Sequence, residues 1–424
     1  MVNVLVVGSG GREHALCWSL AQSGQLGELS CAPGNAGTAE LATNLPIGPE
    51  DSDDLVRVAV ERRVGLVMVG PEAALAAGLV DRLRERGIPA FGPTAAAARI
   101  ESSKAWTKEL LQRIRVPTAR ADVVTTLHEA RRSLARCSYP VVLKADGLAA
   151  GKGVTVAGDA DEAEAALDEL FVARMVGPAA DTVLVEEFLA GRELSVLAFC
   201  DGERLALMPP ARDYKAAHDG DRGPNTGGMG AYSRPGFASP ELMRQVRSQI
   251  LEPVVAEMAA RGHPFVGALY AGLMITPDGP KVLEFNCRFG DPETQVIVPL
   301  LESDLLGVAQ AVVNGRLDET SVRWRPGSAC GVVLASAGYP GPHPLGRPII
   351  GLDGAERDAL VFHAGTARTP DGNLVTAGGR VLTVVGVGDQ LSEARARAYR
   401  AVEAVRFEGR HCRSDIAADE SYGD

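Results

Sequence analysis

Apolar runs that end in glycine-containing turns, with helical patterns between them, dominate the first hundred residues. The runs lie at 2–7, 65–69 and 89–91, and the first is continuous rather than alternating, which is typical of a strand buried on both faces. Helical patterns follow at about 13–23 and 73–87. This alternation of strands and helices predicts an α/β domain with a parallel sheet, whose ligand loops lie at the carboxyl ends of the strands.

From residue 101 onward the elements are shorter and the turns more frequent. We expect helices near 102–113, 127–137, 160–171, 239–261, 292–301 and 303–314, and strands near 140–145, 153–157, 182–188, 193–200, 204–208, 266–276 and 281–287. Residues 209–237 show little periodicity and predict a long polar loop, which in a folded chain is usually functional or disordered. After 326, short strands with Gly/Pro turns and one helix at 391–405 predict a small α+β domain.

Composition narrows the class of protein. A chain of 424 residues, 46% apolar and 23% charged, can bury large cores and is expected to form two to four domains. The formal net charge of -11 argues against nucleic acid or an anionic membrane as the main partner. The seven cysteines are an odd number without a C-x-x-C pair, which predicts free thiols in a reducing compartment. With no basic leader and no long apolar stretch, we expect a cytoplasmic protein.

The motif GSGGREHA at 8–15 joins the first strand to a helix. Backbone N–H groups of Gly10 and Gly11, with Arg12, suit a phosphate at the helix N-terminus. The third glycine of a dinucleotide fingerprint is replaced by Glu13, so an NAD site is a minor alternative. A tight turn without a ligand explains the motif about as well.

A second glycine-rich loop follows Lys144 in VVLKADGLAAGKGV at 141–154. A lysine in an apolar strand is rarely buried without a partner, so we expect Lys144 to face phosphates beneath this loop, which includes Gly151 and Gly153. The loop is not a Walker A motif, because Gly153 stands where Ser or Thr is required. Lys104 is a candidate second phosphate cation on a helix, and the alternative for it is a solvated lysine.

The segment VLVEEFLAGRE at 183–193 places Glu186 and Glu187 at the end of an apolar strand. The backbone there, up to Phe188, can pair with an adenine edge, and Glu193 can accept ribose hydroxyls. The alternative is an ordinary charged strand terminus.

The segment KVLEFNCRFGDPETQ at 281–295 carries the strongest pattern. Side chains alternate along a strand, so Glu284, Asn286 and Arg288 share one face. Carboxylate and amide oxygens suit Mg²⁺, and the guanidinium suits a carboxylate or acyl phosphate. A salt-bridged edge strand is the weaker alternative. The opposite face is expected to pack in the core through Leu283, Phe285 and Cys287.

The polar loop at 212–233 combines glycines with hydrogen-bonding side chains. Glycines such as Gly227 permit close approach of the backbone to a ligand. Asp213, Lys215, Asn225 and Thr226 are candidate contacts. We therefore expect a substrate loop, with a flexible linker as the alternative.

Together the motifs resemble the ATP-grasp superfamily and, over nearly the full length, the phosphoribosylamine–glycine ligase family within it. The matching segments, in family order, are GSGGREHA, APGNAGTA at 32–39, GPEA at 70–73, FGPT at 91–94, KADGLAAGKGV at 144–154, EEFLAGRE, GPNTGGMGAYS at 223–233, EFNCRFGDPETQ and GGRVLTV at 378–384. The resemblance implies a Rossmann-like substrate domain at 1–100, an ATP-grasp domain at 101–325 with a small lid at about 120–190, and an α+β domain at 326–424.

The resemblance also implies a reaction: phosphoribosylamine, glycine and ATP give glycinamide ribonucleotide, ADP and phosphate through glycyl phosphate, in purine biosynthesis. Mg²⁺, with Mn²⁺ as an alternative, is the implied metal, and a monomer or small homo-oligomer without nucleic-acid or membrane partners is expected. The motifs and the resemblance assign catalysis to Arg288, Lys144 and Asp213; nucleotide binding to Lys104, Lys144, Gly151, Gly153, Glu186, Glu187, Phe188 and Glu193; substrate binding to Gly10, Gly11, Arg12, Asn35, Lys215, Asn225, Thr226 and Gly227; and the metal to Glu284 and Asn286.

Two departures from the family pattern stand out. Many ATP-grasp enzymes carry another metal-binding carboxylate on the strand before E-x-N, but the strand GALYAGLMIT has none, and Arg222 precedes GPNTGG where a smaller residue is expected. The alternatives are another ATP-grasp ligase acting on a different acid, against which GPNTGGMG and GSGGREHA weigh, and a non-catalytic nucleotide sensor. A sensor would be expected to lack Lys144, Glu284 or Arg288, all of which are present.

Overall fold

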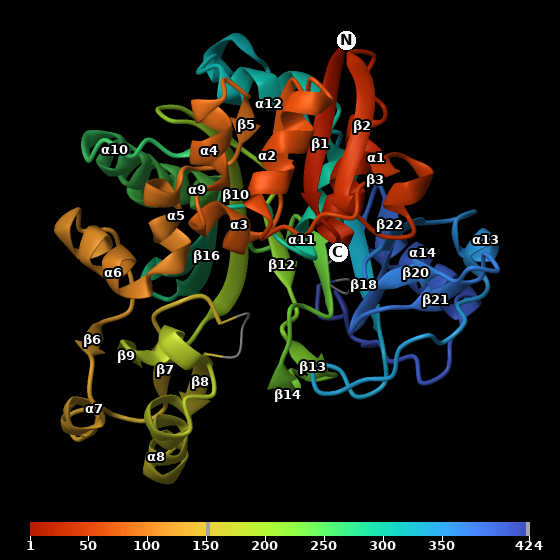
Figure 1. Cartoon of the computed structure of the whole chain (residues 1–424). Helices are drawn as coiled ribbons and strands as arrows, with labels where there is room; N and C mark the ends of the chain where they lie inside the picture. Colours follow the sequence, from red (N-terminus) through yellow and green to blue (C-terminus); the bar gives the residue numbers. More distant parts are fainter. Residues whose placement is uncertain (150–152, 421–424) are drawn as a thin grey trace.

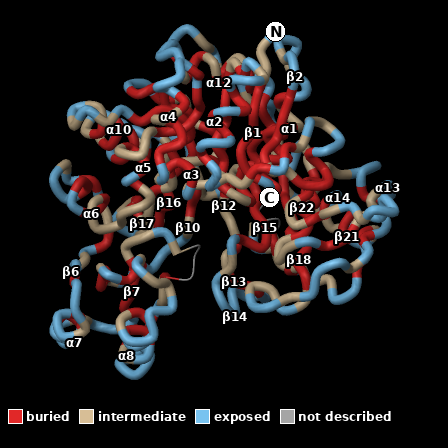
Figure 2. Tube along the Cα trace, viewed as in Figure 1, coloured by how far each residue is buried: buried red, intermediate tan, exposed pale blue. Residues whose placement is uncertain are grey.

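The computed structural model describes residues 1–149 and 153–420. Figure 1 shows the N-terminal sheet beside the C-terminal part of the chain, with a smaller lobe that carries α7 and α8 projecting away from both. Buried positions concentrate where the sheets and helices meet, and exposed positions line the lobe and the outer loops (Figure 2).

The N-terminal sheet is parallel, as predicted, with strand order β3-β2-β1-β4-β5. Its strands are β1 (Val2–Gly8), β2 (Leu26–Pro33), β3 (Thr43–Asn44), β4 (Leu66–Val69) and β5 (Ala90–Phe91), and its helices are α1 (Gly11–Leu20), α2 (Ser52–Glu61), α3 (Glu72–Ala76), α4 (Leu79–Glu85) and α5 (Ala95–Ser102). The single helix predicted at 73–87 is two helices, because Gly78 takes a left-handed conformation (φ 84°) between them.

The lobe is a four-stranded antiparallel sheet of order β6-β9-β7-β8. It comprises β6 (Ala121–Val124), β7 (Val141–Ala145), β8 (Val154–Ala157), β9 (Val183–Glu187), α7 (Leu127–Leu134) and α8 (Ala160–Leu167). Val141, Leu143 and Ala145 pack with the two helices in one apolar cluster. The alternation of side chains along a strand therefore turns Lys144 to the opposite face of the sheet.

A nine-stranded antiparallel sheet connects the middle of the chain to its C-terminal part. Its order is β17-β16-β10-β12-β15-β18-β22-β19, with β11 beside β10. The strands are β10 (Arg192–Asp201), β11 (Leu205–Leu207), β12 (Ala211–Asp213), β15 (Gly230–Ser233), β16 (Val266–Thr276), β17 (Gly279–Asn286), β18 (Ser328–Ala335), β19 (Leu360–His363) and β22 (Arg380–Gly388).

Residues 209–237 are not one long loop, so that prediction was wrong. They form β12, β13 (Ala216–His218), β14 (Arg222–Asn225) and β15, and two of these strands lie in the middle of the large sheet. Strands of three or four residues are too short to show alternation. β15 is buried along its whole length although it contains Gly and Ser.

The remaining elements surround this sheet. They are α6 (Lys104–Arg113), α9 (Pro240–Val246), α10 (Glu252–Ala260), α11 (Glu293–Ile297), α12 (Leu305–Val313), α13 (Leu352–Ala355), α14 (Leu391–Ala404), β20 (Thr366–Arg368) and β21 (Leu374–Thr376). A π-helical turn, Arg247–Leu251, joins α9 to α10, so the helix predicted at 239–261 is confirmed with a distortion in its middle. The helix predicted at 391–405 is confirmed as α14.

Candidate active site

The carboxylate of Glu284 lies among four cations that come from different parts of the chain. Burial alone would raise the pKa of Glu284, but the charges of Lys215, Lys144, Lys104 and Arg288 outweigh it, and the pKa is lowered. The sequence identified these residues in four separate motifs. The fold brings them together where the lobe, β17 and the 212–233 segment meet.

Asn286 and Arg288 extend this site along the same strand and just beyond it. Arg288 Nη2 donates to Asn286 Oδ1 at 3.3 Å. On the other face, Phe285 and Cys287 are buried in the core, as predicted. The expected face alternation therefore holds at the end of β17.

Leu283 departs from that alternation. The register between β16 and β17 shifts beside it, so one additional residue is inserted in β17. Leu283 packs in a small separate cluster with Ala119, Leu189 and Met274. The prediction that Leu283 joins the same core face as Phe285 was wrong, because a β-bulge changes the direction of the side chains that precede it.

Two carboxylates from the N-terminal domain hold Arg288. Its Nε lies 2.9 Å from Glu72 Oε2 and its Nη2 lies 3.1 Å from Glu101 Oε1. Glu101 Oε2 also accepts a hydrogen bond of 2.7 Å from the backbone N–H of Cys287. Burial alone would lower the pKa of Arg288, yet the two carboxylates raise it, so the guanidinium stays charged. Within the described residues, Asp291 and Glu293, which follow Arg288 in the sequence, form no ion pair with it.

Lys144 is buried and lies between the lobe and β17. Its Nζ is 2.9 Å from Glu186 Oε2 and donates to the carbonyl oxygen of Leu283 at 3.1 Å. Glu186 is paired a second time, with Lys108 at 3.1 Å. The sequence interpretation did not include Lys108. The signal was available, because Lys108 is four residues after Lys104 and therefore on the same face of α6.

Lys104 is not a solvated surface lysine. Its Nζ donates to the carbonyl oxygens of Asp146 and Gly147 at 3.4 and 3.2 Å, and burial lowers its pKa. Gly153 packs closely, since an added Cβ would lie 2.9 Å from the side chains of Ala145 and Ala149. Gly151, which we assigned to the nucleotide, lies outside the described residues.

Glu193, Asp213 and Lys215 form the next part of the site. Lys215 Nζ lies 3.0 Å from Glu193 Oε2, and this carboxylate is the main reason that the pKa of Lys215 is raised. Burial raises the pKa of Asp213 to about 7, Lys215 opposes that rise, and the nearby Glu293 and Glu193 add to it. Three acidic groups therefore crowd around one lysine.

The two remaining residues of the EEF motif point elsewhere. Glu187 Oε2 pairs with the exposed Arg120 at 2.8 Å. Phe188 is a large apolar side chain that is 42% exposed at the end of β9. The structure thus separates the buried Glu186 from its neighbours, which lie at the surface.

The GPNTGG segment is structured, so the flexible-linker alternative was wrong. The backbone N–H and the hydroxyl of Thr226 both donate to the carbonyl oxygen of Lys215 at 2.8 Å. The N–H of Gly227 donates to Tyr339 Oη at 3.0 Å. Asn225 ends the exposed strand β14. Arg222 starts that strand and is exposed, which explains why a large residue is accommodated there.

The glycine-rich loop after β1 already uses some of its donors within the protein. The N–H of Gly10 donates to Glu13 Oε2 at 2.6 Å, and the N–H of Arg12 donates to Asp291 Oδ2 at 3.4 Å. Gly11 packs closely against Gln295, and the side-chain amide of Asn35 donates to the carbonyl oxygen of Ser9 at 2.9 Å. A phosphate at this loop would have to replace some of these contacts.

The structure adds no carboxylate on the strand before E-x-N. Tyr270 of β16 lies opposite Asn286, and its hydroxyl donates to Glu293 Oε1 at 2.6 Å. Within 1–149 and 153–420, no three His, Cys, Asp or Glu side chains are placed to hold a metal ion together. The same described residues contain no helix that is long and apolar enough to cross a membrane.

Comparisons with known proteins point to one family. Three models of phosphoribosylglycinamide synthetase match the chain: the N domain at residues 2–101, the ATP-grasp (A) domain at 102–294 and the C domain at 329–419. The phosphoribosylamine–glycine ligase of Rhodopirellula baltica is 49% identical over 424 residues, covering 98% of this chain and 97% of its own length. The trifunctional purine biosynthetic protein adenosine-3 of Gallus gallus is 50% identical over 418 residues, which span 97% of this chain and 42% of that protein.

A solved structure shares the whole architecture. The phosphoribosylamine–glycine ligase of Thermotoga maritima superposes with a TM-score of 0.86 at 36% identity, covering 98% of this chain and 100% of that one. The predicted fold is therefore confirmed: a Rossmann-like N-terminal domain, a central ATP-grasp domain and a small α+β C-terminal domain. An enzyme of this kind uses ATP and a divalent metal. The chain belongs to the phosphoribosylglycinamide synthetase family of ATP-grasp ligases.

Proposed function

We propose that the chain joins glycine to 5-phosphoribosylamine and converts ATP to ADP and phosphate, giving glycinamide ribonucleotide for purine biosynthesis. Relatives with about half of their residues identical over nearly the whole chain support this substrate pair. The single structural observation behind the proposal is the position of Glu284 among Lys104, Lys144, Lys215 and Arg288. Such a site suits negatively charged phosphates and carboxylates beside a metal ligand.

The chemistry proceeds in two displacements. An oxygen of the glycine carboxylate forms a bond to the γ-phosphorus of ATP while the bond to the β-phosphate oxygen breaks, releasing ADP. The amine nitrogen of phosphoribosylamine then forms a bond to the carbonyl carbon of glycyl phosphate, phosphate leaves, and the nitrogen loses a proton. Because phosphorylation supplies the leaving group, the protein contributes mainly positioning and charge stabilisation.

Glu284 and Asn286 are the proposed ligands of the divalent metal, which we take to be Mg²⁺ with Mn²⁺ as a substitute. The donor set fits, since both groups offer hard oxygen atoms and Mg²⁺ commonly takes few protein ligands alongside phosphate oxygens and water. When bound, the metal neutralises charge on the phosphates during transfer. Arg288 is placed beside the same ligands to orient the carboxylate, and later the acyl phosphate.

The lobe and the neighbouring elements α6 and β10 supply the proposed nucleotide contacts. Lys144 and Lys104 bind phosphates, and the backbone near Glu186 and Phe188 meets the adenine. Glu193 is assigned to the ribose. Charge pairing supports the phosphate role of Lys144, because its partner Glu186 is also held by Lys108, so ATP can take over Lys144 without leaving that carboxylate unpaired.

The domain limits and the setting of the enzyme are part of the proposal. We place the boundaries at 1–100, 101–325 and 326–424, with the lid at about 120–190. The matched models cover 2–101, 102–294 and 329–419, so the first boundary coincides with a limit between two models, whereas residues 295–325 lie outside the matched ATP-grasp region. The seven cysteines are free thiols, which supports a reducing compartment such as the cytoplasm. A monomer or small homo-oligomer stays a prediction, and light scattering after gel filtration measures it.

An ADP-release assay tests the function. The enzyme is given ATP and Mg²⁺ with glycine, alanine, serine or bicarbonate, each with and without phosphoribosylamine. We expect ADP release to require both glycine and phosphoribosylamine, and mass spectrometry to show glycinamide ribonucleotide. Release that favours another acid, or that ignores phosphoribosylamine, contradicts the proposal.

A further inference from the structure

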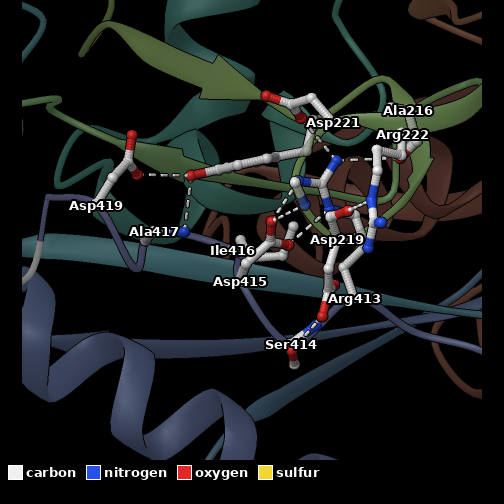
Figure 3. A network of polar contacts seen from close by, with 12 residues as sticks. Ala216, Asp219, Asp221, Arg222, Arg413, Ser414, Asp415, Ile416, Ala417 and Asp419 are labelled. Carbon is white, nitrogen blue, oxygen red and sulfur yellow. Dashed lines mark hydrogen bonds and ion pairs between the residues drawn. The ribbon is translucent and has the colours of Figure 1, made fainter.

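The last described residues of the chain form hydrogen bonds and ion pairs with the segment that carries Asp213 and Lys215. We name residues 411–420 the C-terminal strap. Figure 3 shows strap residues Arg413, Ser414 and Asp415 facing Asp219 and Asp221 at the turn between β13 and β14. The contacts join positions about two hundred residues apart in sequence, which the sequence pattern does not reveal.

Arg413 is the centre of this network, and it is 1% exposed. Its Nη1 donates to the carbonyl oxygen of Ala216 at 3.1 Å and to Asp221 Oδ1 at 2.8 Å. Its Nε and Nη2 donate to the two carboxylate oxygens of Asp415, each at 2.7 Å. The guanidinium also lies 4.7 Å from the ring centre of Tyr214. All three guanidinium nitrogens therefore donate hydrogen bonds.

The strap holds one side of the 212–215 segment, while the candidate active site uses the other. Tyr214 Oη donates to Asp419 Oδ1 at 3.1 Å, and Arg212 Nη1 donates to Asp419 Oδ2 at 2.7 Å. Side chains alternate along an extended segment, so Asp213 and Lys215 point away from the strap. They lie beside Glu193 and Glu284 instead.

These hydrogen bonds continue into the GPNTGG segment. Arg413 holds the carbonyl oxygen of Ala216, and the preceding carbonyl, that of Lys215, accepts two hydrogen bonds from Thr226. A displacement of the backbone at 215–216 therefore moves Lys215 and the Thr226 turn together.

The strap itself is fixed to α14. Arg395 of that helix donates to the carbonyl oxygens of Ile416 and Ser414 at 2.9 and 2.8 Å. Tyr399 Oη donates to the carbonyl oxygen of Arg413 at 2.9 Å. A rigid C-terminal element thus presents Arg413 to the hairpin.

We infer that Arg413 is a positioning residue for the ligase reaction: through the strap it sets the place of Asp213, Lys215 and the Thr226 turn. The inference rests on the proposed roles of Asp213 and Lys215. The hydrogen bonds of Arg413 go to the hairpin and to the strap itself, so it acts on the site through the hairpin. A misplacement of about 1 Å in a catalytic site can cost about 10²-fold in rate, which gives such a residue a kinetic effect.

The test compares Arg413→Lys with Arg400→Lys in the full-length enzyme. Lysine keeps the charge but cannot reproduce the fork. Arg400 is the matched control, since it lies on α14 and its exposed side chain pairs with the exposed Asp358 at 3.2 Å. For Arg413→Lys we expect kcat/KM for phosphoribosylamine to fall about 10- to 100-fold, while KM for ATP changes about 2-fold or less. For Arg400→Lys we expect wild-type values of both parameters.

A milder variant covers the case in which Arg413→Lys folds poorly. Asp221→Asn removes one exposed carboxylate partner, and asparagine tolerates the left-handed backbone at this position (φ 53°). We expect a smaller loss in the same parameter with an unchanged Tm. A lower Tm with wild-type kinetics per folded molecule in both variants would show that the strap is only structural, and would overturn the inference.

Lys215→Met in the same assay distinguishes a failure of this inference from a failure of the residue assignments on which it rests. If Lys215→Met has wild-type kinetics, the assignment of Lys215 fails and the role of Arg413 fails with it. If Lys215→Met is impaired while Arg413→Lys behaves like Arg400→Lys, only the positioning role is overturned.

Discussion

Arg288 and Glu72 form an ion pair, Nε to Oε2 at 2.9 Å, that joins residues 216 positions apart in the sequence. Glu72 belongs to the GPEA segment after β4, and the pair therefore connects the N-terminal domain to the E-x-N strand. With Glu101 on the other side, the guanidinium is held at a fixed orientation beside Asn286. This is the kind of support that an oriented cation needs before the substrate arrives.

Arg288→Lys is expected to lose about 10²–10³ in kcat while the affinity for ATP stays nearly unchanged, because one contact that strengthens in the transition state typically contributes this much. Lysine cannot contact Glu72, Glu101 and a substrate carboxylate with one planar fork. Steady-state kinetics and Tm are measured on the same preparation. A destabilised enzyme with normal turnover per folded molecule would show that Arg288 only links the two domains.

Lys144→Met is expected to weaken binding of ADP and of a non-hydrolysable ATP analogue by more than about tenfold, because a buried cation that faces phosphates contributes a strong charge-assisted contact. The fold is expected to survive, since Glu186 keeps its pair with Lys108. Isothermal titration measures the affinity. Lys281→Met is the control, as Lys281 lies on β17 but pairs with the exposed Asp278 at 4.0 Å. Wild-type affinity together with wild-type turnover in Lys144→Met refutes the assignment.

Glu284→Gln and Asn286→Leu are expected to raise the Mg²⁺ concentration needed for half-maximal activity, each by about tenfold or more, since each removes an oxygen ligand from a site with few protein ligands. The measurement is ADP release titrated with Mg²⁺, repeated with Mn²⁺. Glu302→Gln, at an exposed position outside this motif, serves as the control. An unchanged profile in both site variants places the metal elsewhere.

Stability is expected to fall as the pH drops from 6.5 toward 4, because of a buried histidine pair between α1 and β19. Burial lowers the pKa of His14 to about 3 and of His363 to about 4, and the backbone N–H of His363 donates to His14 Nδ1 at 2.8 Å. A histidine with a lowered folded pKa stabilises the protein fully above its unfolded pKa of about 6.5, and this contribution is lost below it.

At pH 5 the loss is about 2 kcal/mol for each of the two histidines. Urea unfolding at pH 5, 6, 7 and 8 measures it, and His363→Gln is expected to flatten the dependence, whereas the exposed His128→Gln is not. An equal slope in all three proteins would contradict the role of the pair.

Local sequence patterns were sufficient to predict much of the architecture and the part of the candidate site that lies on β17. The continuous apolar run of β1, followed by glycines, indicated a parallel sheet, and the alternation at the end of β17 placed Glu284 on the face opposite Phe285. The second inference needs only the period of a strand, which neighbouring residues determine.

Other features depended on segments that are far apart in the chain. The bulge at Leu283, the two carboxylates on Arg288, the pairing of Lys108 with Glu186 and the strap around Arg413 all arise from how strands and helices meet. A charged residue in the sequence shows that a partner is needed, but burial in a particular tertiary arrangement decides which partner it obtains. The sequence by itself determined which side chains we propose for the chemistry; the tertiary structure decided what holds each of them in place, because those contacts exist only once distant segments are packed together.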